Sequence, residues 1–453
     1  MSGERTDDPI LTEGLLQRIL TSIVGNGAVP GIGVAINQGG KTIECYAGKS
    51  NFDANIEMGS CARFEISCMM KFYLALISLK MASEGLLDID APIGKYLTDL
   101  HIRVPSKTTA ICIQHLLSHT SGYRGVNIQE AKYKWNFSWD KMIEFLEGTP
   151  QLFQPGMTFN YEHSEHVILG EIIARVSGIS PTRCVEDQIF SPLGIYSSNA
   201  RHSDIVTSYT KNNGRFVSVK MPPLGEFWRA SLSDKALTLR EILSIGEALL
   251  SRERLSLPET IVTQLFQPVI RLKKVFKMPA SEHMPMSFGL GAAQYWDGVI
   301  GHNGSTMGQT CALRLVPAEG LSIVVGINAW APHIRDTLIE LILKLSTWGR
   351  YPQKHSPNME RKDDNLFCGA DSSKFVGNYI GSYYGNLLVT VDKRGLRIST
   401  TSKGGGHNIF EAKLNSDGHV EMRAPTPVSL GFYLDPIDKT PCLAFGGYTY
   451  KMR

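Results

Sequence analysis

Residues 64–72 read FEISCMMKF, and this stretch decides how the chain is expected to fold and react. Lys71 stands three positions after Cys68 and four after Ser67. The residues that follow are apolar with helical periodicity, which predicts a helix over about 67–84. Positions i and i+3 share a helix face, so the Lys71 amine can stand beside Cys68 and take its proton. A thiol at the start of a helix is also favoured as a thiolate by the helix dipole.

Length and composition are those of a folded protein with more than one domain. At 453 residues, with 43% hydrophobic and 20% charged residues, the chain exceeds one ordinary core. A net charge of +3 from 46 basic and 43 acidic residues forms no basic stripe, so we expect no nucleic-acid partner. The sequence has no apolar run of about 18 residues and no secretory signal pattern, so we expect no membrane partner. The sequence does not indicate an oligomeric state.

The cysteines indicate a reducing compartment. Eight of them are scattered along the chain, at positions 45, 61, 68, 112, 184, 311, 368 and 442, mostly inside apolar runs. Disulfide frameworks are dense in short secreted chains, whereas scattered cysteines in apolar runs are typical of buried free thiols. We therefore expect a cytoplasmic protein.

Strand patterns near both ends of the first 350 residues predict one sheet assembled from distant segments. Residues 31–48 are typical of a hairpin that turns at Gly39-Gly40. Two further strands are predicted at 310–316 and 321–327, and a helix follows at about 334–347. Between the hairpin and these strands the chain shows short helical patterns separated by proline and glycine, which indicates a helical insert.

We expect three parts in the chain. Residues 1–350 are an α/β (α+β) domain, an antiparallel sheet flanked by helices, with the helical insert at about 86–300. The polar segment 351–371 has no periodicity and is interpreted as a linker. Short alternating runs separated by turns over 372–453 predict a small antiparallel β-barrel domain.

Three short stretches, far apart in sequence, combine into one candidate site. The first is CMMK at 68–71. The second, FNYEHSEHVILGEIIARVSG at 159–178, has Tyr161 and His163 before an apolar helical run. The third, GHNGSTMGQTCALRLVP at 301–317, is a Gly-rich turn leading into a strand, where small residues let a substrate approach the backbone.

With these stretches in this order, the chain resembles the serine β-lactamase and penicillin-binding-protein superfamily, specifically the class C branch with its esterases, D-aminopeptidases and fungal acyltransferases. That family carries S-x-x-K, Y-x-N, and K-T-G or H-x-G. The resemblance covers about residues 10–348 and includes GLLDIDAPIGKYL, IQHLLSHTSG, FSPLGI and FGLG. It implies an antiparallel sheet, a helical domain and a site between them. The C-terminal part is similar, more weakly, to the lipocalin-like barrel of family D-aminopeptidases.

The register of this resemblance places the nucleophile at Cys68. Family members often have an aromatic residue four positions before the nucleophile and a lysine three after it, which Phe64 and Lys71 match. Ser67 stays an alternative, because a spacing of four also shares a helix face. Cys68 departs from the family's serine, as a natural or an engineered replacement. His163 departs from the asparagine of Y-x-N, and a thiol beside an imidazole is a common activated pair.

The resemblance and the chemistry together imply roles for these residues. Cys68 attacks an acyl carbon and forms a thioester, while Lys71 accepts the proton, its pKa lowered by burial near other cations. Tyr161 shuttles a proton to the leaving group and from the acceptor. His163 is either a catalytic partner or a structural hydrogen-bonding residue. His302 supplies the cation or donor of the third motif.

The rest of the third motif is expected to bind substrate. Asn303 and Gly304 line the strand edge along which the substrate lies, and the Ser305 N–H joins the Cys68 N–H in an oxyanion hole. The stretch from Gly404 to His407 is either a loop that reaches the site or a plain surface turn.

The expected function is acyl transfer through a thioester on Cys68, by an acyltransferase, cyclase or hydrolase of an amide, ester or thioester. A small-molecule or peptide-like acyl compound is the expected substrate. Two alternatives stay open: a catalytically silent member of the fold that binds or assembles, and a serine-type peptidase or esterase with an engineered cysteine. We expect no cofactor and no metal, because HLLSH at 115–119 lacks a zincin's glutamate and His163 and His166 lack a nearby third ligand.

Overall fold

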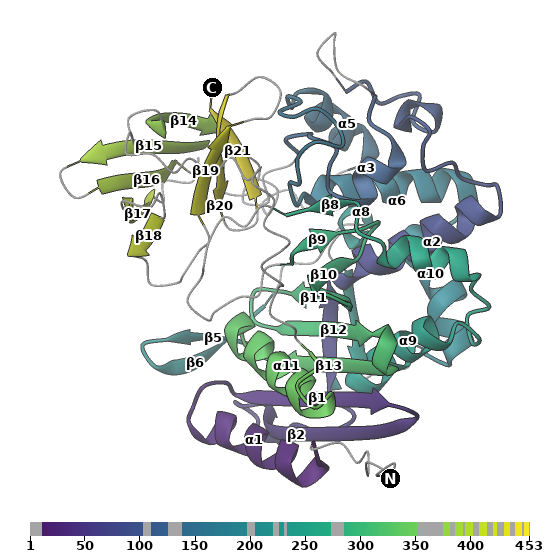
Figure 1. Cartoon of the computed structure of the whole chain (residues 1–453), viewed down its shortest axis with the longest axis vertical. Coiled ribbons are helices and arrows are strands. Elements are labelled where there is room, and N and C mark those ends of the chain that lie inside the picture. The colour runs from purple at the N-terminus through teal and green to yellow at the C-terminus, as the bar shows by residue number, and fades with distance from the viewer. Residues whose placement is uncertain are drawn as a thin grey trace, which may run out of the picture.

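The structure is a computed structural model of the chain (Figure 1). It describes residues 11–102, 110–125, 138–196, 204–220, 226–230, 233–272, 285–351, 375–380, 386–392, 395–401, 407–414, 420–423, 430–434, 440–445 and 448–452.

Within the described residues, the main sheet has nine antiparallel strands in the order β3-β2-β1-β13-β12-β11-β10-β9-β8. Their bounds are β1 Gly31–Gln38, β2 Lys41–Asn51, β3 Ile56–Glu57, β8 Ile270–Arg271, β9 Ser287–Phe288, β10 Ala293–Trp296, β11 Val299–Ser305, β12 Thr310–Val316 and β13 Leu321–Ile327. The predicted hairpin is confirmed as β1 and β2, and Gly39 and Gly40 both adopt positive φ at its turn. Strand β1 pairs with β13, nearly 300 residues later, which confirms a sheet built from distant segments.

The helices confirm two predicted elements. Their bounds are α1 Glu13–Gly25, α2 Met69–Ser83, α3 Ile113–Leu117, α5 Trp139–Glu147, α6 His163–Ser177, α7 Pro181–Val185, α8 Glu226–Arg229, α9 Leu239–Ser251, α10 Glu259–Phe266 and α11 Pro332–Ser346. The helices predicted at 67–84 and 334–347 correspond to α2 and α11. Helix α2 starts two residues later than predicted, because Ser67 still belongs to strand β4 (Arg63–Ser67), which pairs with β7 (Ser233–Thr238).

Helices cover both faces of the main sheet. Helices α1 and α11 pack on one face and α9 on the other (Figure 1). Successive side chains of a strand point to opposite faces of the sheet. In β1, Val34 packs with α1 and α11, whereas Ala35 packs on the side of α9. Helix α2 is buried on almost every side among α6, α7 and α10, so its first turn is held in one place.

A second antiparallel sheet follows near the C-terminus. Its order is β18-β17-β16-β15-β14-β21-β20-β19. Its strands are β14 Gly377–Ile380, β15 Asn386–Asp392, β16 Gly395–Thr401, β17 His407–Leu414, β18 Val420–Arg423, β19 Leu430–Leu434, β20 Pro441–Phe445 and β21 Tyr448–Met452. The end strands β18 and β19 contact each other, which curves the sheet toward the predicted barrel. Cys442 packs on Phe153, and Lys451 Nζ donates to Leu152 O at 3.2 Å, so this sheet contacts the segment that precedes α6.

The domain boundaries expected from the sequence stay predictions. Strands β8, β9 and β10 of the main sheet lie at 270–296, within the range expected to be a helical insert. Most of the predicted linker at 351–371, and Gly404 to Gly406, lie outside the described residues. Among the helices that the structure describes, none has both the length and the apolar character needed to cross a bilayer.

We expect Leu239→Ala to destabilise the protein by about 2–5 kcal/mol, because this buried side chain fills the space above two glycines of the sheet. A Cβ added at Gly33 or Gly326 would lie 2.7 or 2.8 Å from the Leu239 methyl groups. Leu86→Ala is the matched control, since Leu86 is 55% exposed and its loss is expected to cost less than about 0.5 kcal/mol. Guanidinium chloride unfolding of both variants measures the difference, and equal costs would contradict this packing role.

Candidate active site

Cys68 lies at the junction where strand β4 ends and helix α2 begins. It is the N-cap residue of α2, with a helical backbone conformation (φ −61°, ψ −15°). Its thiol is free and partly exposed, whereas almost all of the helix behind it is buried. An accessible sulfur at the positive end of a fixed helix has the position that a nucleophile requires.

The hydroxyl of Ser67, the alternative nucleophile, is engaged in a hydrogen bond to the backbone of β11. Its hydroxyl donates to Ser305 O at 2.7 Å, and the residue is 2% exposed. Its φ of +44° is in the left-handed region, which a non-glycine residue adopts only when its surroundings hold it there. The hydroxyl of Ser67 thus joins β4 to β11, while the strained turn presents the next residue.

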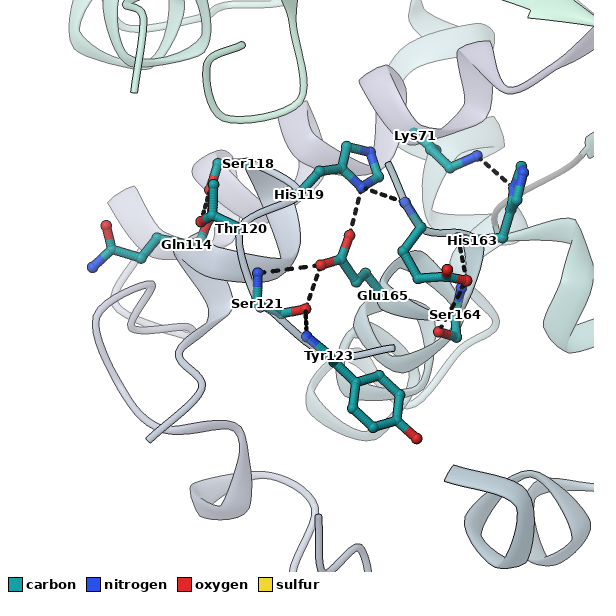
Figure 2. Close-up of polar contacts among 11 residues, drawn as sticks. Lys71, Gln114, Ser118, His119, Thr120, Ser121, Tyr123, His163, Ser164 and Glu165 are labelled. Atoms are coloured by element: carbon teal, nitrogen blue, oxygen red, sulfur yellow. Dashed lines mark hydrogen bonds and ion pairs between the residues drawn. The ribbon is translucent and has the colours of Figure 1, made fainter. Parts of the chain in front are cut away.

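Lys71 is fully buried and its amine contacts His163. The distance from Lys71 Nζ to His163 Nδ1 is 3.1 Å, and the two side chains point toward each other in Figure 2. Burial lowers the pKa of Lys71, while the nearby Cys68 raises it. Burial, followed by the charge of Lys71, also lowers the pKa of His163 well below its usual value. Burial thus favours the neutral amine, the form that can accept a proton, more than it is favoured in an exposed lysine.

Tyr161 completes the group around the thiol. The amine of Lys71 lies 4.8 Å from the centre of the Tyr161 ring, and the rings of His163 and His302 are 5.6 and 6.4 Å from it. Removal from water raises the pKa of Tyr161, and the charge of Cys68 and a hydrogen bond with it raise this pKa further. The structure thus brings together Cys68, Lys71, Tyr161, His163 and His302.

The third motif lies on β11, and its histidine is a neutral acceptor. His302 Nδ1 is 2.6 Å from Asn303 O, and a carbonyl only accepts, so Nδ1 carries the proton and Nε2 does not. Burial, then the charge of Lys71, lowers the pKa of His302 to about 3. A neutral imidazole therefore occupies the position where the sequence suggested a cation or donor.

Gly304 lets β11 run against the end of β4. A Cβ at this position would lie 2.3 Å from Ile66 O, so no larger residue fits without moving the backbone. Asn303 is oriented by Arg314, whose Nη2 donates to Asn303 Oδ1 at 2.7 Å. Arg314 is itself buried, and it contacts Asp336 and the face of the Tyr295 ring. Sequence reasoning missed Arg314, although an arginine inside the apolar run TCALRLV is a signal for a buried charge.

A second group that sequence reasoning missed lies behind Tyr161. His119, Glu165 and His166 are fully or almost fully buried, and the His119 and His166 rings are 4.8 Å apart. His119 Nδ1 is 2.5 Å from Glu165 Oε2. In the sequence, the stretch IQHLLSHTSG counts as a flanking similarity and as a rejected metal-ligand pair, and nothing in its spacing indicates a partner 46 residues later.

The histidine pair of HLLSH does not converge on one point. His115 Nδ1 accepts from Cys112 N at the start of α3, whereas His119 contacts Glu165. In the part of the chain that the structure describes, no cluster of three or more His, Cys, Asp or Glu side chains is arranged to hold a metal ion. The side chain of His407 lies outside that part.

We expect the stability of the fold to fall as the pH drops from about 7 toward 5. Burial lowers the pKa of five histidines: His115, His119, His163, His166 and His302. An unfolded chain binds protons on histidine below about pH 6.5, which the folded protein excludes, so unfolding takes up protons. Glu165 opposes this trend because burial raises its pKa, but it is one group against five.

Denaturant unfolding between pH 5.5 and 7.5 measures this dependence. His166→Phe removes one of these titrating groups and is therefore expected to reduce the dependence of the unfolding free energy on pH. The substitution breaks no hydrogen bond seen among the described residues, because neither buried ring nitrogen of His166 has a partner there. A wild-type unfolding free energy that is constant over this range would contradict the neutral state of the cluster.

Comparisons with known proteins identify relatives and structural neighbours of this chain. Penicillin-binding protein 4 from Amycolatopsis lactamdurans is 24% identical over 356 residues, which cover 73% of this chain and 90% of that protein. The crystal structure of SurE aligns with a TM-score of 0.72 at 19% identity, covering 97% of this chain and 99% of SurE. D-amino acid amidase from Ochrobactrum anthropi SV3, in complex with L-phenylalanine, aligns with a TM-score of 0.60 at 19% identity, covering 74% and 98%. The two structural likenesses show the fold alone.

A family model described as Beta-lactamase matches residues 16–346. This range contains the main sheet and the residues around Cys68. The chain belongs to the beta-lactamase family.

Proposed function

We propose that the protein is an enzyme that transfers acyl groups through a covalent thioester on Cys68. The family assignment supports acyl-transfer or amide-hydrolase chemistry in general. The observation that carries the finer proposal is the buried Lys71 amine, which contacts His163 and lies over the Tyr161 ring beside a partly exposed thiol. A buried amine with a lowered pKa is suited to accept the proton of a nucleophile.

In the proposed reaction Cys68 Sγ gives its proton to Lys71 Nζ and bonds to the acyl carbon. The bond from that carbon to the leaving nitrogen, oxygen or sulfur breaks, and Tyr161 gives the leaving group a proton that Lys71 then replaces. The Cys68 and Ser305 N–H groups stabilise the oxyanion. Water, an amine or a thiol next gives up its proton through Tyr161 and attacks the thioester, and Cys68 leaves as the thiol.

His163 and His302 have separate roles in this proposal. His163 accepts from the amine of Lys71 at Nδ1, which orients the amine toward Cys68. His302 presents Nε2 as an acceptor, because Nδ1 is used by Asn303 O. We propose that Nε2 binds an N–H or O–H of the substrate, and that Asn303 and Gly304 line the strand along which the substrate lies.

The proposed substrate is a small-molecule or peptide-like amide, ester or thioester. Thioesters react readily with amines and thiols as well as with water, so the sulfur nucleophile favours acyl transfer or cyclisation over hydrolysis. A D-amino acid amidase is among the structural neighbours, so amides and thioesters of D-amino acids are the first donors to test.

We expect intact-protein mass spectrometry to detect an acyl adduct after incubation with activated acyl thioesters or p-nitrophenyl esters. The adduct should be absent in Cys68→Ala and present in Ser67→Gly. Glycine is chosen at position 67 because it tolerates the positive φ, so this control removes the hydroxymethyl side chain without adding backbone strain. Loss of the adduct in Ser67→Gly with retention in Cys68→Ala would make Ser67 the nucleophile. The absence of any adduct, with Cys68 readily alkylated, would support a catalytically silent binding protein.

We expect Lys71→Met to slow acylation of Cys68 by about 10²–10⁴-fold, the range typical of losing a general base. His163→Asn retains a side chain that can accept from Lys71 and should slow acylation by less than about tenfold, whereas His163→Leu should slow it more. Stopped-flow acylation rates at saturating donor measure these effects. Equal rates in Lys71→Met and wild type would exclude Lys71 as the base.

A further inference from the structure

We propose that Glu165, as a neutral carboxylic acid, acts together with His119 to position Tyr161. This inference rests on the proposed function, in which Tyr161 moves the proton. Their contacts are with the ring and backbone of the Tyr161 segment and with Ser121, so they are positioning residues. Figure 2 shows Glu165 between His119 and Ser121.

His119 holds the backbone on both sides of Tyr161. Its carbonyl accepts from Asn160 N at 2.8 Å, and its Nδ1 accepts from Glu162 N at 3.2 Å. The ring of His119 also packs on the Tyr161 ring, with 4.3 Å between centres and 38° between planes. A single residue therefore fixes the chain before and after Tyr161 and supports one face of its ring.

Glu165 in turn fixes the His119 ring. Its Oε2 is 2.5 Å from His119 Nδ1. Its Oε1 accepts from Ser121 Oγ at 2.5 Å and from Ser121 N at 3.3 Å. Because Glu165 is 1% exposed, water cannot replace these contacts if they are lost. His119 has a φ of +55°, a conformation that needs such support in a non-glycine residue.

The hydrogen bonds also assign the proton between Glu165 and His119. Since Nδ1 of His119 accepts from Glu162 N–H, this nitrogen carries no proton of its own. A contact of 2.5 Å between it and a carboxyl oxygen needs a hydrogen, which we assign to Glu165, so that its O–H and the Glu162 N–H share the lone pair of Nδ1. Burial, followed by the charge of Glu162, raises the pKa of Glu165 well above its usual value, in agreement with a protonated acid.

The proton assignment makes glutamine the conservative substitution. In Glu165→Gln the amide N–H can donate to His119 Nδ1, and the amide oxygen can accept from Ser121, so all contacts have a counterpart. In Glu165→Leu the side chain keeps its approximate volume but makes neither contact. An ionised glutamate would behave differently, since its two oxygens would accept from His119 Nδ1–H and from Ser121, and the single oxygen of glutamine could then accept from only one of them.

The test compares wild type, Glu165→Gln and Glu165→Leu in two measurements. The first is the rate constant for acylation of Cys68 at saturating p-nitrophenyl ester, with the apparent donor affinity recorded separately. We expect Glu165→Gln to stay within about threefold of wild type and Glu165→Leu to be slower by about tenfold to a hundredfold with little change in donor affinity, as for a misplaced reacting group. The second is the ¹³C ring resonance of Tyr161, which should coincide in wild type and Glu165→Gln and be shifted or broadened in Glu165→Leu.

A matched control and a milder variant separate positioning from folding. Ser118→Ala removes a buried serine of the same segment, which bonds Gln114 O and Thr120 Oγ1 and makes no hydrogen bond to Glu165. It should leave the acylation rate and the Tyr161 resonance unchanged. Ser121→Ala removes one of the Glu165 contacts and should move both readouts in the direction of Glu165→Leu, which keeps the test valid if the leucine variant does not fold.

The outcomes discriminate between the two proposals. If Glu165→Gln is damaged as much as Glu165→Leu, the neutral acid is excluded, and if Glu165→Leu matches wild type in both readouts, the positioning role is excluded. If wild type forms no adduct on Cys68, the proposed function fails, and the Tyr161 resonance still reports whether Glu165 and His119 position the ring.

Discussion

The complete burial of the Lys71 amine is the constraint on which the rest of the site depends. An ammonium removed from water is costly unless it is paired, so its neighbours decide both its protonation and its position. These neighbours are the imidazole of His163, the ring of Tyr161 and the thiol of Cys68. An ionised carboxylate in direct contact would hold the proton on Lys71. A neutral imidazole instead leaves the amine free to exchange it.

The charges of the two nearby glutamates raise the pKa of Lys71, against the effect of burial, but each glutamate also makes hydrogen bonds to other groups. Glu162 caps helix α6, where its Oε1 accepts from the backbone N–H groups of His163 and Ser164. Glu165 faces away from the amine toward His119 and Ser121, and burial raises its pKa. The site is therefore a layer of neutral rings around one amine and one sulfur, backed by carboxyl groups that have other hydrogen bonds.

The junction between β4 and α2 fixes the sulfur relative to the third motif. Ser67 is held at positive φ by its bond to Ser305 O, and Gly304 lets β11 approach the carbonyl of Ile66. Strain of this kind persists only where the surrounding structure overdetermines the backbone. The buried helix α2 and the main sheet surround this junction, so Cys68 is held in a defined position relative to the β11 edge.

The sequence by itself determined the elements and the order of the motifs. Turn residues and apolar runs identified the hairpin around Gly39 and strands β12 and β13, and helical periodicity identified helix α2, because these signals depend on neighbouring residues. The spacing from Cys68 to Lys71, followed by Tyr161 and the H-x-G stretch, was enough to indicate the family. The tertiary structure decided which side chains of remote segments touch: it turned Ser67 toward Ser305, made His302 an acceptor and placed His119 and Glu165 behind Tyr161. Such contacts join residues tens to hundreds of positions apart, and their geometry and burial depend on the packing of the whole domain, which leaves no local pattern in the chain.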